Sequence, residues 1–220
     1  MYSLAQVPRH QGPIAPSELT ALFRGAIKHP QVRLSTKRSA LVSFNQVSVG
    51  GDYDPEDDKL GDPCIQVYLL YHSSQQHLEL NVSQWRRLCF DIAECIGHEL
   101  VHRAQAKRRK YKLAREYLSR AHCSHQREEQ QYLGSPDEIE AYGFSIAAEL
   151  AAMHGCFSLE EIQQHNIMMY QVYTSTFDND QSVVLKLQHQ ISKYLRRLEA
   201  DYYDQQSSKR STARGRARST

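Results

Sequence analysis

The spacing of hydrophobic residues changes along the chain, and each change predicts a different kind of element. Between positions 15 and 29 the larger apolar residues recur every three or four positions, which is the period of an amphipathic helix. The runs 40–49 and 64–72 are rich in β-branched and aromatic residues and predict strands, and 77–82 predicts a third. Segment 50–63, with its glycines, prolines and aspartates, predicts a solvated turn. Because these connections are too short for crossover helices, we expect a small antiparallel or mixed sheet.

From position 83 onward the pattern becomes helical. The first of these helices has one buried stripe, made of Leu88, Ile92, Ile96 and Leu100. Further helices are predicted as far as residue 204, ending with an amphipathic helix over 185–203 whose apolar face carries Leu185, Ile191, Leu195 and Leu198. The expected fold class is therefore α+β, a mainly helical domain with a small N-terminal sheet packed on the helix that begins near 83.

The sequence predicts one domain with an irregular segment at each end. Residues 1–16 hold three prolines and little apolar periodicity, so they predict an irregular N-terminal arm. The domain itself is expected over 17–205, since 220 residues are enough for one proper core and short for two. Residues 206–220 contain several arginines and no apolar residue larger than alanine, which predicts a disordered basic tail.

Composition narrows the classes of protein that the chain can belong to. Hydrophobic residues at 40% and charged residues at 24% are typical of a soluble globular protein. A net charge of +2 is too small to indicate a nucleic-acid partner, apart from weak nonspecific contact of the basic tail. No apolar run approaches the roughly 20 residues that cross a bilayer, and the first residues lack the apolar core of a secretory signal. We therefore expect no membrane partner and a cytoplasmic location.

The five cysteines are scattered and include no CxxC pair, so reduced, buried thiols are expected rather than a disulfide framework. They are Cys64, Cys89, Cys95, Cys123 and Cys156. One alternative stays open, because His122, Cys123 and His125 lie close together in the sequence and could bind a metal ion.

The stretch CIGHELVHRAQ, residues 95–105, contains the pattern HExxH. Residues four apart in a helix lie on the same face, so His98 and His102 can direct their imidazoles at one atom. Two such imidazoles suit adjacent corners of a zinc tetrahedron. Glu99 lies about 100° round the helix, where it can accept a proton from a water activated by the metal. The motif predicts a zinc site with His98 and His102 as ligands and Glu99 as general base.

A third protein ligand must come from elsewhere in the chain, and five side chains are candidates: His122, His125, Glu138, Glu140 and His154. Ser135 and Pro136 together form a helix start in which Glu138 is the third residue. Glu138 and Glu140 point about 200° apart on a helix, so both cannot face one metal ion. Glu138 lies in the first helical turn, where the helix dipole favours a carboxylate, but it could instead close a capping box on Ser135. Glu140 would then bind the metal or hydrogen-bond a ligand histidine.

Residues 85–150 resemble the gluzincins, a group of zinc metallopeptidases in which the HExxH helix is followed by a helix with a glutamate ligand in an E-x-x-A setting. Glu138 and Ala141 reproduce that setting, and the layout is similar to small metallopeptidases of tailed bacteriophages. The resemblance implies a zincin-like domain over 17–205 that binds zinc through His98, His102 and Glu138. It also implies a peptidase that acts on a protein or peptide in phage assembly or intracellular processing, in the host cytoplasm or the virion.

Two positions depart from the family pattern. Tyr142 stands where many gluzincins have an acidic residue, and Arg103 stands where they have an uncharged one. The residue that stabilises the oxyanion stays open among Tyr142, His122 and His125. The alternative to a peptidase is a non-catalytic protein of the same fold, a structural virion component or a regulator.

Overall fold

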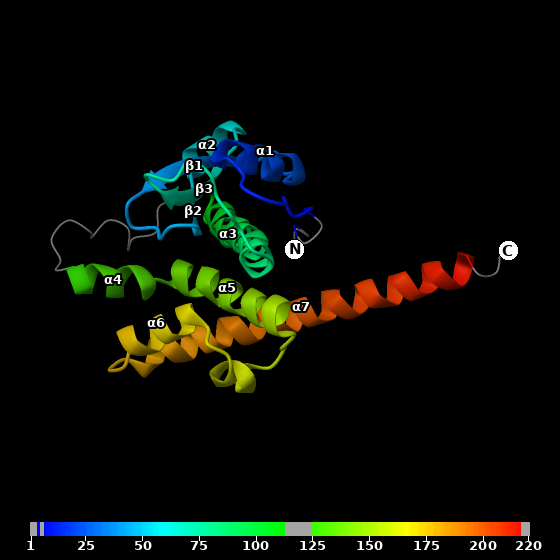
Figure 1. Ribbon diagram of the computed structural model, residues 1–220. Coiled ribbons are helices and arrows are strands. Elements are labelled where there is room, and N and C mark those ends of the chain that lie inside the picture. The colour runs from blue at the N-terminus through cyan, green and yellow to red at the C-terminus, as the bar shows by residue number, and fades with distance from the viewer. Residues whose placement is uncertain (1–3, 5–6, 113–124, 217–220) are drawn as a thin grey trace. The chain divides into compact units, whose positions relative to one another are not determined.

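The structure is a computed structural model that describes residues 4, 7–112 and 125–216 (Figure 1). The chain divides into two compact units, residues 1–119 and 120–220, where the sequence predicts one domain over 17–205. The first unit contains α1 (Pro16–Ala26), β1 (Val32–Ser39), β2 (Val47–Tyr53), α2 (Pro55–Leu60), β3 (Ile65–His72) and α3 (Val82–Arg108). The second contains α4 (His125–Leu133), α5 (Pro136–His154), the 3-10 helix η3 (Leu159–Gln164), α6 (Met168–Thr176) and α7 (Gln181–Arg216).

The sheet of the first unit has the strand order β1-β3-β2, with β1 parallel and β2 antiparallel to β3. This confirms the expected α+β class and the mixed sheet. The strand prediction over 40–49 is wrong for most of its length, since Leu41 and Phe44 are 96% and 61% exposed and only 47–49 pair. The strand at 32–39 was missed because its sequence is mostly polar, with Leu34 as its one buried residue.

The predicted third strand at 77–82 is also corrected. Only Leu78 takes part in a bridge, to Ile14, and Asn81 already caps the next helix. The side chain of Asn81 accepts a hydrogen bond from the Gln84 amide, and that of Gln84 accepts one from the Asn81 amide, both at 2.9 Å. This reciprocal cap satisfies two amide groups that the helix itself leaves without partners, and it fixes the start of α3.

The core of the first unit lies between one face of the sheet and the helices α1 and α3. Alternate residues of β3 are buried in it, as are the predicted stripe residues Leu88, Ile92 and Ile96. The N-terminal arm also contributes to it, since Leu4, Val7 and Ile14 are buried. The indole nitrogen of Trp85 donates to the carbonyl of Val7 at 3.3 Å, and its ring stacks on Phe23 with 5.4 Å between centroids. These three residues of the predicted arm are therefore part of the core of this unit.

The segment predicted as a solvated turn, 50–63, contains the short helix α2. The side chain of Asp54 accepts hydrogen bonds from the amides of Glu56 and Asp57, and Gly61 ends the helix with φ at 82°. One of its acidic residues, Asp58, is buried. The prediction of a solvated segment is wrong at Asp58. A buried carboxylate needs a partner, and here the partner comes from a distant segment that local composition does not reveal.

The second unit is helical, and Figure 1 shows α5 lying along α7. Their approach depends on Gly143, because a Cβ atom there would lie 2.5 Å from the Cβ of Gln190. The buried stripe of α7 consists of Val183, Val184, Leu187, Ile191 and Leu195. Leu185, predicted on that face, is 63% exposed, and α7 continues to Arg216 through most of the segment predicted as a disordered tail. Among the described residues, no helix combines the length and the apolarity that a membrane span requires.

Candidate metal site

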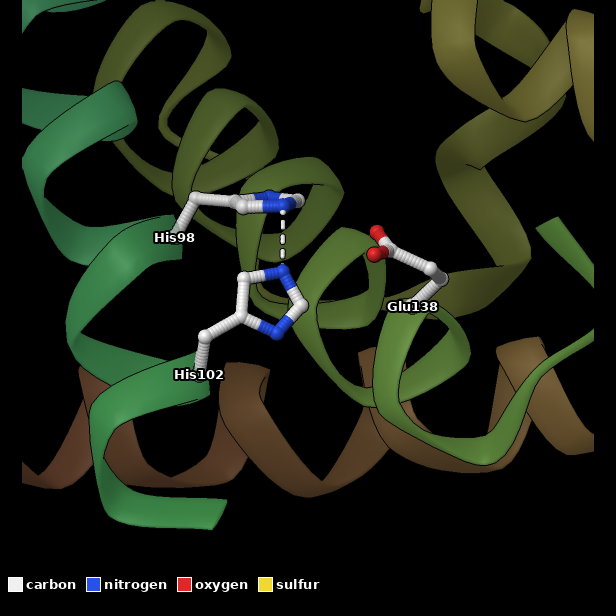
Figure 2. A group of neighbouring side chains, drawn as sticks. All are labelled: His98, His102 and Glu138. Carbon is white, nitrogen blue, oxygen red and sulfur yellow. Dashed lines mark hydrogen bonds between the residues drawn. The ribbon is translucent and has the colours of Figure 1, made fainter. Parts of the chain in front are cut away.

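His98 and His102 lie on one face of α3, as their spacing predicts. Their Nε2 atoms are 3.1 Å apart, and the two rings meet edge to face with 4.9 Å between centroids (Figure 2). Two nitrogen ligands at about 2.05 Å from zinc in a tetrahedron are separated by roughly 3.3 Å. The pair therefore has nearly the nitrogen spacing of two ligands on one zinc ion.

The second ring nitrogen of His102 is held by α3 itself. Nδ1 of His102 lies 2.9 Å from Oε1 of Gln105, whose side chain is buried. An amide oxygen only accepts hydrogen bonds, so this contact suits the tautomer with the hydrogen on Nδ1 and the lone pair on Nε2, which is the form that can bind a metal ion through Nε2. Partners of this kind fix the tautomer and the orientation of metal-binding histidines in proteins.

Glu99 is 7% exposed and packs beneath the outer strand β2. Gly51 of that strand lies directly over it, since a Cβ atom there would lie 3.2 Å from Cγ and Oε1 of Glu99 and 2.6 Å from Sγ of Cys95. Burial, and then the Glu99 carboxylate, raise the pKa of the Cys95 thiol, which stays neutral. The glycine thus admits the carboxylate to a space that any larger residue would fill.

Arg103, which departs from the gluzincin pattern, forms an ion pair with the buried carboxylate of Asp58. Its guanidinium donates to Oδ1 of Asp58 from Nε at 2.9 Å and from a terminal nitrogen at 2.8 Å. The hydroxyls of Tyr53 and Tyr111 donate to Oδ2 at 3.1 and 3.0 Å. Burial alone would raise the pKa of Asp58, but the hydrogen bonds from Arg103, Tyr111 and Tyr53 outweigh it and hold that pKa below its usual value.

In the second unit, Glu138 occupies the first turn of α5 and is 2% exposed. Its amide donates to the hydroxyl of Ser135 at 3.3 Å, which confirms the predicted cap. The amide of Ser135 donates to the carbonyl of Tyr132 at 3.1 Å, so the hydrogen that a capping box would use is already engaged. This arrangement weighs against a purely capping role for the Glu138 carboxylate.

The side chains of Glu140 and Tyr142 contact other residues of the second unit. Oε1 of Glu140 accepts from Lys193 at 3.2 Å and from the hydroxyl of Tyr194 at 3.4 Å, both on α7. The ring of Tyr142 packs edge to face against Tyr173 with 5.7 Å between centroids. Glu140 is therefore part of the α5–α7 contact, and Tyr142 borders the core.

The remaining candidates for the third ligand are His122, His125 and His154. His122 and Cys123 lie outside the described residues, and only the backbone of His125, at the start of α4, is described. His154 ends α5 and stacks on His165 with 4.2 Å between centroids. His165 itself belongs, with Cys156 and Glu161, to a second group of possible metal ligands. The sequence prediction missed that group, although the order H-x-C-x4-E-x3-H over 154–165 is a signal that could have indicated it.

The residues predicted as ligands fit a metal ion by their donor chemistry. Each of His98, His102 and Glu138 offers one donor atom of a kind that binds metal ions, and nothing among these residues identifies zinc. The histidines belong to the first unit and the glutamate to the second. Comparison with known proteins adds no assignment, since no family model, curated protein or solved structure matches the chain.

Proposed function

We propose that this protein is a zinc-dependent peptidase in which His98, His102 and Glu138 bind the metal ion and Glu99 is the general base. The observation that carries the proposal is the short distance between the Nε2 atoms of His98 and His102, 3.1 Å. Glu99, the residue next to His98 in α3, is buried. An exposed helix turn with two surface histidines would require neither this spacing nor the buried Gln105 behind His102.

The donor set favours a catalytic ion over a structural one. Two imidazoles and one carboxylate fill three positions of a tetrahedron and leave the fourth for water or substrate, as in catalytic zinc sites. Glu138 is preferred to Glu140 as the third ligand because Glu140 is already paired with Lys193 and Tyr194. A carboxylate in the first turn of α5 is also favoured by the helix dipole.

Hydrolysis at this site would use the bound metal ion, Glu99 and the outer strand β2. A zinc ion bound here supplies Lewis-acid polarisation of the scissile carbonyl and acidification of water. Glu99 accepts the proton of the attacking water and passes it to the leaving amine. An extended substrate can add to the outer strand β2 through backbone hydrogen bonds, which would bring its scissile bond close to Glu99 at Gly51.

The substrate class is a protein or peptide, and the likeness of the HExxH layout to phage metallopeptidases supports a role in virus assembly or intracellular processing. The proposal is tested on the full chain by metal analysis together with hydrolysis of a denatured protein. Glu99→Gln should keep the metal and reduce hydrolysis by roughly 100-fold or more, because the amide cannot accept the proton. Glu79→Gln, an exposed site in the same unit, is the matched control.

The ligands are tested by pairs of variants. His98→Ala and Glu138→Ala should each lower the metal content by one equivalent per chain, whereas Glu140→Ala should leave it unchanged. If the Glu138 variant keeps the metal and the Glu140 variant loses it, the ligand assignment is wrong. A metal-loaded wild type that hydrolyses no protein or peptide would instead establish the non-catalytic alternative, a structural or regulatory protein.

A further inference from the structure

A second group of metal-binding side chains lies within the second unit, after the end of α5. Gly155 ends that helix with φ at 65°, a left-handed conformation that suits glycine. The chain turns back there, and the amide of Cys156 donates to the carbonyl of Leu150 at 3.0 Å. The 3-10 helix η3 follows and ends just before His165. This path brings Cys156, Glu161 and His165 together within ten residues of sequence.

The donor atoms of these three side chains all lie within 4.8 Å of one another. Neighbouring ligands on a tetrahedral zinc ion with one sulfur and one nitrogen are roughly 3.6 Å apart. A contraction of about 1 Å is therefore enough to close the group on an ion. Glu161 is exposed and His165 half-buried, so both can move toward the buried Cys156 without repacking the core.

The chemistry of the group selects among metal ions. A thiolate with an imidazole suits zinc, whereas magnesium and calcium prefer oxygen ligands alone. The ring of His154 stacks on that of His165 at the edge of this group.

We propose that Cys156, Glu161 and His165 bind a second zinc ion, independent of the histidine pair on α3, and that this ion has a structural role. It fastens the segment 155–167, which contains the buried residues Ile162 and Ile167, to the end of α5. The thiol of Cys156 donates a hydrogen bond to the carbonyl of Ser158 at 3.2 Å, so it carries a proton. Binding therefore releases the thiol proton, as at other cysteine sites.

Cobalt substitution tests this site separately from the proposed catalytic one. Cobalt(II) bound to a thiolate gives an intense sulfur-to-metal charge-transfer band in the near ultraviolet, and the ligands proposed for the catalytic site include no sulfur. The full chain loaded with cobalt should show this band. Cys156→Ser should abolish it and lower the zinc content by one equivalent. Cys89→Ser, which removes a buried thiol of the first unit, should leave both unchanged.

Two further variants cover the case in which Cys156→Ser fails to fold. Glu161→Gln and His165→Ala alter side chains that are not buried, and each should weaken cobalt binding and shift the band. His98→Ala should leave the band intact, so failure of the catalytic site and failure of this site are distinguishable. A band that is absent from the loaded wild type, or that persists in Cys156→Ser, overturns the proposal. In the second outcome, Cys123 would be the thiolate to test.

Discussion

At the scale of single residues, two adjacent glycines of β2 face different surroundings. A Cβ atom on Gly51 would lie 2.6 Å from Sγ of Cys95, while one on Gly50 would meet only Cδ1 of Leu70 at 3.7 Å, an ordinary contact. Both residues precede the same turn and carry no side chain of their own. Only position 51 has no room for a Cβ atom, and the side chains that fill the space there include Glu99, the proposed general base.

Gly51→Ala is expected to lower the free energy of unfolding by about 1–3 kcal/mol, because buried Cys95 must move to admit the methyl group. The same movement should displace Glu99 and reduce hydrolysis by more than the loss of stability explains. Urea unfolding and activity of the folded fraction measure the two effects. Gly50→Ala is the control, and an equal loss of activity in both variants would contradict the argument.

Individual residues also show which parts of the site could be predicted. His98, Glu99 and His102 could be predicted because one helical turn fixes their relation. Ser135 and Pro136 likewise predicted the start of α5. Gly51 and Gln105 could not be predicted as supports of the site. The contact of Gly51 joins a strand to a helix over 40 positions away, and Gln105 is identified only once its burial is known.

At the scale of elements, the short helix α2 is tied to the end of α3 by Asp58. Its carboxylate accepts from Arg103, the residue that follows His102. This link restrains the rotation of the last turns of α3, which carry the histidine pair. A turn at 50–63 could be expected from its residues, but the ion pair could not, because 45 positions separate its two partners.

The Asp58 link makes a pH-dependent contribution to stability. The folded-state pKa of Asp58 is lowered below the usual 3.8, so the contribution is present above about pH 4 and is lost as the pH falls through the folded value. Asp58→Asn should therefore cost roughly 1.5–3 kcal/mol at pH 7, typical of hydrogen bonds to a charged group. At pH 3 and below, the difference from wild type should shrink.

Urea unfolding at both pH values measures this effect. Asp62→Asn, at an exposed position just beyond α2, should change stability little at either pH. A deficit of Asp58→Asn that is constant between pH 7 and pH 2 would contradict the argument, because it would show that the pKa of Asp58 is the same in the folded and unfolded protein.

At the scale of the whole molecule, the chain has two compact units with separate cores. The sequence did not indicate this division, because helical periodicity continues through both and hydrophobic content does not change sharply between them. The proposed catalytic ion takes two ligands from the first unit and one from the second. If this ion binds as proposed, the thermal unfolding of the first unit should depend on a residue of the second unit.

Calorimetry tests that link. At free zinc of 100 times the dissociation constant, binding adds about 2.7 kcal/mol, and the melting temperature of the first unit should rise by roughly 10 °C. Glu138→Ala should remove most of this rise although it lies in the other unit, whereas Glu140→Ala should preserve it. An equal rise in the Glu138 variant would show that the histidines bind zinc without that glutamate.

Trp85 is the only tryptophan of the chain, and it lies in the core of the first unit, stacked on Phe23. The second unit contains tyrosines but no indole. Intrinsic tryptophan fluorescence is therefore a built-in optical reporter of one unit alone. When it is recorded beside the calorimetric trace, its midpoint identifies which of two heat-absorption peaks belongs to the unit that carries His98 and His102.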